Sequence, residues 1–152
     1  MGKVILIVDD ETDFSELLQF RLRDREYEVL SAATGAEALD KARRHLPDAI
    51  LMDLLLPDLD GLTLCEILRR HHTTRGTPII MISAVANDVT RHSARIAGAS
   101  AFLGKPLDFE KLKAELQSAI AKREDSPEPQ AIEPKTVVNS TPNPSSATDS
   151  AA

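Results

Sequence analysis

Cysteine and aromatic residues are scarce in this sequence. It has one cysteine, no tryptophan and five aromatic residues in 152. A single cysteine excludes an intrachain disulfide and favours a reducing compartment. Cys65 lies in an apolar stretch, as a small buried residue does. Apolar residues still make up 42% of the chain, so the core must be built from Leu, Ile, Val and Ala. The length of the chain suits one domain rather than two.

Long apolar runs and basic runs are missing as well. The run Val4–Val8 is too short for a signal peptide or a membrane span, and Leu6 breaks the myristoylation pattern that Gly2 would begin. A net charge of −6 argues against DNA binding, which needs a basic surface. We interpret the cluster Arg69-Arg70-His71-His72 as the polar C-terminal end of a helix, where cations suit the dipole. We therefore expect a soluble, cytoplasmic protein that binds neither DNA nor a membrane.

The composition changes at residue 123. Residues 123–152 hold five of the nine prolines, two basic and five acidic residues, and mostly Ser, Thr, Asn and Ala besides. Such a segment buries too little apolar surface to offset the entropy lost on ordering. We predict a folded domain over residues 1–122 and a disordered Pro/Ser/Thr-rich tail over residues 123–152.

The first 122 residues alternate strand-like with helix-like stretches. Strands are predicted at Val4–Val8, Tyr27–Ala32, Ala49–Met52, Ile79–Ile82 and Ala101–Leu103. Helices are predicted around an apolar stripe of Phe14, Leu17, Leu18 and Leu22, then at Thr34–His45, around Leu64–Leu68, at Asp88–Ala97 and at Leu107–Lys122. Thr34 with Glu37 fits a capping box, and Asp108 is placed to cap the last helix. The pattern predicts an α/β fold with a parallel sheet between helices, whose ligands bind beyond the carboxyl ends of the strands.

Polar residues stand at four of these predicted strand ends. The first strand ends in Asp9-Asp10-Glu11, the third in Asp53 and the fourth in Ser83, and the fifth leads into Lys105. Carboxylates that are brought together repel one another unless a cation lies between them. The available ligands are oxygens, with no His or Cys cluster, so Mg²⁺, or Mn²⁺ in its place, fits better than zinc.

The same groups suit a phosphoryl ligand. A carboxylate can attack phosphorus and form an aspartyl-phosphate, and this transfer needs mainly positioning and charge stabilisation. Lys105 offers an ammonium group and Ser83 a hydroxyl group to the phosphoryl oxygens. Taken alone, Asp9 and Asp10 are also explained as helix caps, and Lys105 as an ordinary surface lysine. Their coincidence at successive strand ends favours a phosphorylation switch.

Four motifs resemble those of a known family. They are Val8-Asp9-Asp10-Glu11, Leu51-Met52-Asp53-Leu54 with Pro57 and Asp60-Gly61, Ile80-Met81-Ile82-Ser83-Ala84, and Phe102-Leu103-Gly104-Lys105-Pro106. In order and spacing over residues 3–122, the chain resembles the receiver domain of bacterial two-component response regulators, in the single-domain form of the chemotaxis regulators. The resemblance implies a flavodoxin-like (βα)₅ three-layer sandwich with a parallel five-stranded sheet of order 2-1-3-4-5.

The resemblance also implies roles for the residues at the strand ends. Asp53 would be the phosphoacceptor. Asp10 and Asp53 would bind Mg²⁺ directly, Asp9 would act through water, and the backbone carbonyl of Leu55 would be a further metal ligand. Lys105 would contact the phosphoryl group.

Two further residues match the switch pair of this family. The hydroxyl of Ser83 would move towards the phosphoryl group while the ring of Phe102 turns inward. The bond Lys105-Pro106 is typically cis in such domains. Leu55 and Val85 occupy variable positions beside the site, and both are apolar. We hypothesise that they hinder the attacking water and prolong the life of the phosphoryl-aspartate.

The implied function is phosphorelay signal transduction by a switch, not multiple-turnover catalysis. The phosphoryl donor would be a sensor histidine kinase or a phosphotransfer protein. No output domain is recognisable after Lys122, so we expect a stand-alone regulator. It would bind an unknown downstream protein through the surface of the fourth helix, fifth strand and fifth helix, and a weak homodimer is compatible with this family.

Two other classes compete with this interpretation. A phosphatase of the haloacid dehalogenase type would need Asp-x-Asp after the first strand, where this chain has Asp9-Asp10-Glu11. A phosphorylation-independent binding module is the other class. Its flavodoxin-like version would need a Ser/Thr- and Gly-rich phosphate loop after the first strand, where this loop is acidic.

Overall fold

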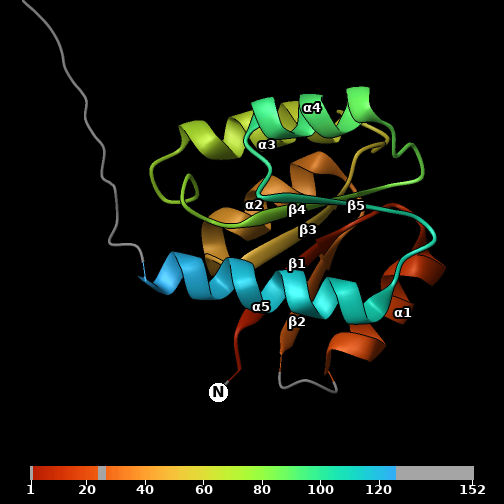
Figure 1. Cartoon of the computed structure of the whole chain (residues 1–152). Coiled ribbons are helices and arrows are strands. Elements are labelled where there is room, and N and C mark those ends of the chain that lie inside the picture. The colour runs from red at the N-terminus through yellow and green to blue at the C-terminus, as the bar shows by residue number, and fades with distance from the viewer. Residues whose placement is uncertain (1, 24–26, 126–152) are drawn as a thin grey trace, which may run out of the picture.

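The computed structural model describes residues 2–23 and 27–125. In this part of the chain, five strands alternate with five helices (Figure 1). The strands are β1 (Val4–Val8), β2 (Glu28–Ala32), β3 (Ala49–Asp53), β4 (Ile79–Ser83) and β5 (Ala101–Gly104). The helices are α1 (Thr12–Arg23), α2 (Gly35–His45), α3 (Gly61–Arg70), α4 (Asp88–Ala97) and α5 (Phe109–Asp125). These bounds confirm the predicted alternation and differ from the predicted ends by a few residues, as helix and strand ends commonly do.

The five strands form one parallel sheet of order β2-β1-β3-β4-β5. This order confirms the flavodoxin-like α/β fold. Val8 pairs with Met52, so Asp9 and Asp53 come next to each other as the chain leaves the two strands. Ser83 pairs with Gly104, which places Lys105 at the same edge of the sheet. The topology therefore collects the predicted site residues at the carboxyl ends of the strands.

Two separate apolar clusters make the core, one on each face of the sheet. Alternate residues of β1 show why, because Leu6 and Val8 face one cluster while Ile5 and Ile7 face the other. The first cluster is closed by α2, α3 and α4, and the second by α1 and α5. Figure 1 shows the same three layers, with α5 and α4 on opposite sides of the sheet. Strands buried on both faces explain the continuous apolar runs in the sequence.

Polar side chains fix where the helices begin. Thr34 caps α2 and accepts a hydrogen bond from the backbone N–H of Glu37 at 3.1 Å. The Glu37 carboxylate accepts from the backbone N–H of Ala33 rather than of Thr34, one residue off the predicted capping box. Asn87 caps α4 with a complete capping box. Asp108 accepts from two backbone N–H groups of the first turn of α5, as predicted.

Some predicted details are corrected. Leu17, placed on the buried stripe of the first helix, is 44% exposed, since Leu18 and Leu22 fill the space beneath α1. The last helix continues to Asp125, three residues beyond its predicted end at Lys122. The remainder of the predicted tail lies outside the described residues. Within residues 2–23 and 27–125, every helix is too short or too polar to cross a lipid bilayer.

Candidate functional site

Three aspartates converge at the carboxyl edge of the sheet. Asp53 is the last residue of β3, and Asp9 and Asp10 follow β1 directly. One carboxylate oxygen of each of the three lies within 4.8 Å of the others. Asp9 and Asp53 are buried, whereas Asp10 is exposed. The structure thus brings together the three side chains that the sequence assigned to a metal.

Burial dominates the electrostatics of the two inner carboxylates. Desolvation raises the pKa of Asp9 and also that of Asp53. For Asp53 the charge of Lys105 and the N–H groups of Leu55 and Leu54 oppose this rise. For Asp9 the main opposing contact is a 2.8 Å hydrogen bond from the backbone N–H of Glu11. In the absence of added cations, both acids are harder to ionise here than in water.

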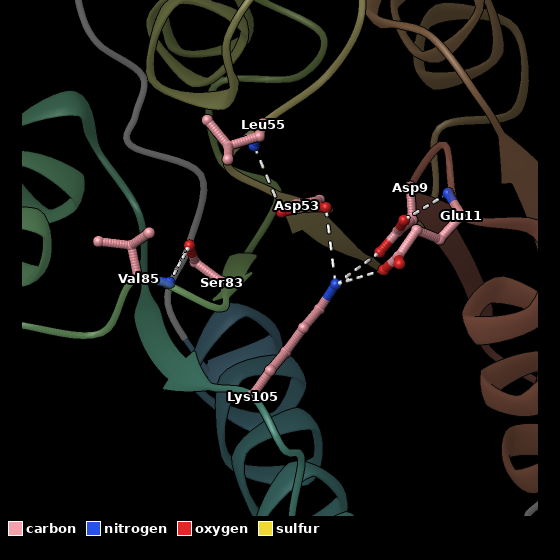
Figure 2. A network of polar contacts seen from close by, with 7 residues as sticks. All are labelled: Asp9, Glu11, Asp53, Leu55, Ser83, Val85 and Lys105. Atoms are coloured by element: carbon pink, nitrogen blue, oxygen red, sulfur yellow. Dashed lines mark hydrogen bonds and ion pairs between the residues drawn. The ribbon is translucent and has the colours of Figure 1, made fainter.

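Lys105 supplies the positive charge of the site. Its Nζ lies 3.1 Å from Oε1 of Glu11, 3.4 Å from Oδ2 of Asp9 and 3.6 Å from Oδ2 of Asp53. Figure 2 shows the extended side chain reaching between these carboxylates. The ammonium group also lies 4.2 Å from the centre of the Phe14 ring, an arrangement in which the ring attracts the cation. The bond from Lys105 to Pro106 is cis, as predicted.

Sequence reasoning assigned no role to Glu11 or Phe14 in holding Lys105. The sequence pattern places Glu11 in the acidic motif and Phe14 on an apolar stripe. Glu11 belongs to the acidic loop and directly precedes α1, and Phe14 lies in the first turn of this helix. That nearness along the chain was the available signal. The contact itself depends on how the loop after β5 approaches α1, which a sequence pattern does not specify.

Ser83 lies at the end of β4, on the other side of Asp53 from Asp9. Its side chain is buried, and its Oγ accepts a hydrogen bond from the backbone N–H of Val85 at 3.0 Å. Leu55 similarly donates its backbone N–H to Oδ1 of Asp53 at 3.3 Å. Figure 2 shows Leu55 and Val85 flanking the site with their apolar side chains. Leu55 is 62% exposed and Val85 43% exposed.

Phe102 lies on β5 and is half-buried. Its ring packs against the cluster formed by α2, α3 and α4. The guanidinium group of Arg91 lies over this ring, 5.2 Å from its centre. Ser83 and Phe102, the predicted switch pair, therefore belong to neighbouring strands. That role stays a prediction.

Two contacts fix the loop after Asp53: the start of α3 lies very close to the end of β3, and the side chain of Asp58 binds the first backbone N–H groups of α2. The backbone N–H of Gly61 donates to the carbonyl of Leu54 at 2.7 Å. A Cβ at Gly61 would lie 2.6 Å from the carbonyl oxygen of Asp53, so only glycine lets α3 begin this close to β3. Asp58 accepts from the backbone N–H groups of Gly35 and Ala36, which ties the loop to α2. These N–H bonds lower the pKa of Asp58.

The site fits a hard divalent cation. Four carboxylates gather here, those of Asp9, Asp10, Glu11 and Asp53. Across the described residues, Lys105 is the only basic side chain within ion-pair distance of any of them. An all-oxygen donor set with excess negative charge is the type that Mg²⁺ prefers. The carbonyl of Leu55, predicted as a further ligand, is not tested by these contacts and stays a prediction.

The chain is similar to proteins of one known family. Residues 5–117 match the response regulator receiver domain family. The chain is 41% identical over 118 residues to Response regulator PleD of Caulobacter vibrioides, covering 78% of this chain and 26% of PleD. It is 35% identical over 124 residues to the alkaline phosphatase synthesis transcriptional regulatory protein PhoP of Bacillus subtilis, covering 82% of this chain and 51% of PhoP. The chain thus spans about a quarter of the length of PleD and about half of the length of PhoP.

Solved structures agree with this match. A putative response regulator from Chloroflexus aurantiacus is 38% identical with a TM-score of 0.77, covering 80% of this chain and 99% of that one. The receiver domain of the sensor histidine kinase PA1611 from Pseudomonas aeruginosa is 35% identical with a TM-score of 0.74 and the same coverage. That structure has a magnesium ion coordinated in its active site cleft.

Domain match, strand order and site geometry agree with one another. The acidic pocket of Asp9, Asp10 and Asp53 is typical of a magnesium site, and Lys105 lies beside it. A receiver domain is a phosphoacceptor switch rather than a conventional enzyme. This chain belongs to the response regulator receiver domain family.

Proposed function

We propose that this protein receives a phosphoryl group on Asp53 and uses it to change its binding to a partner. One observation carries the proposal. The carboxylate of Asp53 ends β3 within 4.8 Å of the oxygens of Asp9 and Asp10 and 3.6 Å from Nζ of Lys105. A nucleophile, a cation-binding pair and an ammonium group are thus gathered at one point.

The proposed reaction is a single phosphoryl transfer. A carboxylate oxygen of Asp53 bonds to phosphorus while the bond from phosphorus to the donor imidazole nitrogen breaks, and that nitrogen regains a proton from solvent. Lys105 holds one phosphoryl oxygen, and the Ser83 hydroxyl leaves the N–H of Val85 to hold another. Asp9, Asp10, Asp53 and the Leu55 carbonyl would hold Mg²⁺. The metal would supply further positive charge to the phosphoryl oxygens.

The proposed output is a change in protein binding. Ser83 ends β4 and Phe102 lies on the neighbouring strand β5, beneath the surface of α4, β5 and α5. Recruitment of the Ser83 hydroxyl by the phosphoryl group would move the β4–α4 loop, because that hydroxyl now binds Val85. We propose that this chain acts in the cytoplasm and signals by binding another protein. Its donor would be a sensor histidine kinase or phosphotransfer protein.

Labelling with acetyl phosphate and Mg²⁺ tests the phosphoacceptor. We expect the intact mass to rise by one phosphoryl group, and hydroxylamine to remove that group as it does from an acyl phosphate. Asp53→Asn should abolish labelling. Asp40→Asn is the matched control, because Asp40 is an exposed residue of α2 outside the site. Full labelling of Asp53→Asn, or repeated turnover of phosphate esters, would overturn the proposal.

A pull-down from cell extract tests the output. The full chain treated with beryllofluoride and Mg²⁺, which imitates the phosphorylated aspartate, is compared with the Asp53→Asn chain. We expect a partner that is retained by one form and not by the other. Equal retention of every bound protein by the two forms would contradict a phosphorylation-dependent output.

A further inference from the structure

We infer that Asp58 is a positioning residue for the proposed metal site, and that it acts by holding the loop between β3 and α3 against the start of α2. This loop runs over residues 54–60 and contains both Leu55 and Asp58. The inference rests on the proposed function, because that function places Mg²⁺ on Asp53 and on the backbone carbonyl of Leu55. It adds a residue that touches neither the metal ligands' side chains nor the phosphoryl group.

The carboxylate of Asp58 binds the N-terminal end of α2 with both of its oxygens. Oδ1 accepts a hydrogen bond from the backbone N–H of Gly35 at 2.8 Å, and Oδ2 accepts one from that of Ala36 at 3.0 Å. The first N–H groups of a helix have no partner within the helix, and the helix dipole favours a negative charge beside them. The hydroxyl of Thr34 accepts from the next N–H group, that of Glu37. Asp58 therefore binds the two N–H groups of α2 that precede the one bound by Thr34.

Close packing supports the same contact between loop and helix. A Cβ at Gly35 would lie 2.8 Å from Cγ of Leu59 and 3.3 Å from Oδ1 of Asp58, so the absence of a side chain at Gly35 lets the loop come near. Leu56 and Leu59 are half-buried and pack against the apolar cluster beneath α2, α3 and α4. Hydrogen bonds from α2 and apolar packing thus fix the middle of the loop.

Leu55 depends on this support, because its own groups hold it weakly. Its side chain is exposed, and its backbone N–H donates to Oδ1 of Asp53 at 3.3 Å, which is long for such a bond. Among residues 2–23 and 27–125, no backbone N–H group donates to the Leu55 carbonyl. That carbonyl is available to a cation, and its direction is set by the backbone of the loop. Groups that orient a metal ligand commonly change metal affinity by about tenfold or more.

The test measures the Mg²⁺ affinity of the full chain by NMR, from the amide shifts of residues 9–11 and 53–55. Asp58→Ala removes both hydrogen bonds from α2, and we expect it to weaken Mg²⁺ binding about tenfold. Asp58→Asn loses the charge but keeps an oxygen that accepts from a helix N–H group, so we expect a smaller loss. Without metal, the amide hydrogen of Leu55 should exchange with solvent several-fold faster in Asp58→Ala than in the original chain.

Thr34→Ala is the matched control, because it removes the other side-chain cap of the same helix end. We expect a lower urea midpoint in both Thr34→Ala and Asp58→Ala, since each loses a cap. Only Asp58→Ala should bind Mg²⁺ more weakly. If Thr34→Ala weakened Mg²⁺ binding to the same extent, the affinity would follow the stability of α2, and the positioning role of Asp58 would be wrong.

Three other results would also overturn the inference. Unchanged Mg²⁺ affinity in Asp58→Ala, with or without faster exchange at Leu55, would show that the packing of Leu56 and Leu59 is enough to place the carbonyl. Equal losses in Asp58→Ala and Asp58→Asn would assign the effect to the charge of Asp58 rather than to its hydrogen bonds. An original chain that binds no Mg²⁺ would leave Asp58 without a metal site to support.

Labelling with acetyl phosphate separates this inference from the proposed function. If Asp53 of the original chain is labelled and Asp58→Ala binds Mg²⁺ as tightly as the original chain, the role of Asp58 fails and the proposed function stands. If Asp58→Ala loses Mg²⁺ affinity as expected and Asp53 of the original chain is never labelled, the proposed function fails and the role of Asp58 stands. Where both hold, labelling of Asp58→Ala should slow at low Mg²⁺ and recover at saturating Mg²⁺.

Discussion

The Nζ of Lys105 lies 3.6 Å from Oδ2 of Asp53. This distance is within ion-pair range and beyond a hydrogen bond, while Glu11 holds the same ammonium at 3.1 Å. The lysine is thus placed beside the proposed nucleophile, Asp53, and is bound more closely by the exposed carboxylate of Glu11. A phosphoryl oxygen on Asp53 would offer it a closer and more negative partner.

Replacing this lysine tests its electrostatic role. In Lys105→Met we expect the pKa of Asp53 to rise further, because the charge of Lys105 now opposes the effect of burial. We expect labelling by acetyl phosphate to slow about a hundredfold, the usual cost of one lost charge-stabilising donor. Carboxyl NMR titration and intact mass measure the two effects. Lys122→Met, at an exposed position of α5, is the control, and an unchanged Asp53 pKa in Lys105→Met would contradict the argument.

Asp53→Asn should stabilise the metal-free protein at neutral pH. Burial raises the pKa of Asp53, so the folded state binds more protons than the unfolded state between the ordinary pKa and the raised one. Stability therefore falls as pH rises through that interval and stays lower above it. Asp53→Asn has no carboxylate to ionise at this position, so it lacks the cost of burying the charge. We therefore expect its free energy of unfolding to be about 1 kcal/mol higher than that of the original chain.

Urea unfolding across pH measures this difference. We expect the difference in unfolding free energy between Asp53→Asn and the original chain to shrink below the ordinary pKa of an aspartate, because Asp53 is then protonated in both the folded and the unfolded state. Added Mg²⁺ should shrink or reverse the same difference, because it binds the folded original chain. Asp40→Asn serves as the comparison, since Asp40 is exposed and forms a surface ion pair with Arg44, a type of pair that contributes little to stability. A stability gain of Asp53→Asn that persists unchanged into acid would show that its cause is not ionisation.

Gly61→Ala should destabilise the domain and disturb Asp53. The added Cβ would lie 2.6 Å from the carbonyl oxygen of Asp53 and 3.0 Å from Cα of Leu54. Because both are backbone atoms, α3 must shift, at a cost of about 1–3 kcal/mol. Gly76→Ala is the matched control, since a Cβ there meets nothing within 4 Å. Urea unfolding compares the two variants, and equal stability would show that the approach of α3 to β3 is not tight.

Polar residues in place of Leu55 or Val85 should shorten the life of the phosphoryl-aspartate. Both side chains flank Asp53 and Ser83 in Figure 2, where they would limit the approach of water to phosphorus. We expect Leu55→Asn and Val85→Asn to lose the label several-fold faster, followed by intact mass after removal of acetyl phosphate. Val89→Asn, an exposed position of α4 outside the site, should not change the rate. Unchanged lifetimes in both site variants would reject the hypothesis.

The sequence by itself determined the fold and most of the site. Apolar runs such as Val4–Val8 and Ala49–Met52 mark strands buried on both faces. Amphipathic helical stretches alternate with these strands, and this alternation favours a parallel sheet with helices packed on both faces. Carboxyl ends of parallel strands share one edge, so Asp9, Asp53 and Lys105 had to converge there. The strand and helix patterns are local in the sequence, and the rule that parallel strands end at one edge of the sheet needs only their order along the chain.

Only the tertiary structure decided which side chains from distant parts of the sequence contact one another. Arg69 lies in the last turn of α3, as interpreted from the sequence, but it also donates to the carbonyls of Gly98, Arg75 and Thr77. Phe14 lies against Lys105 rather than serving only in an apolar stripe. Such contacts depend on distances between segments far apart in the chain, and residue periodicity carries no information about them.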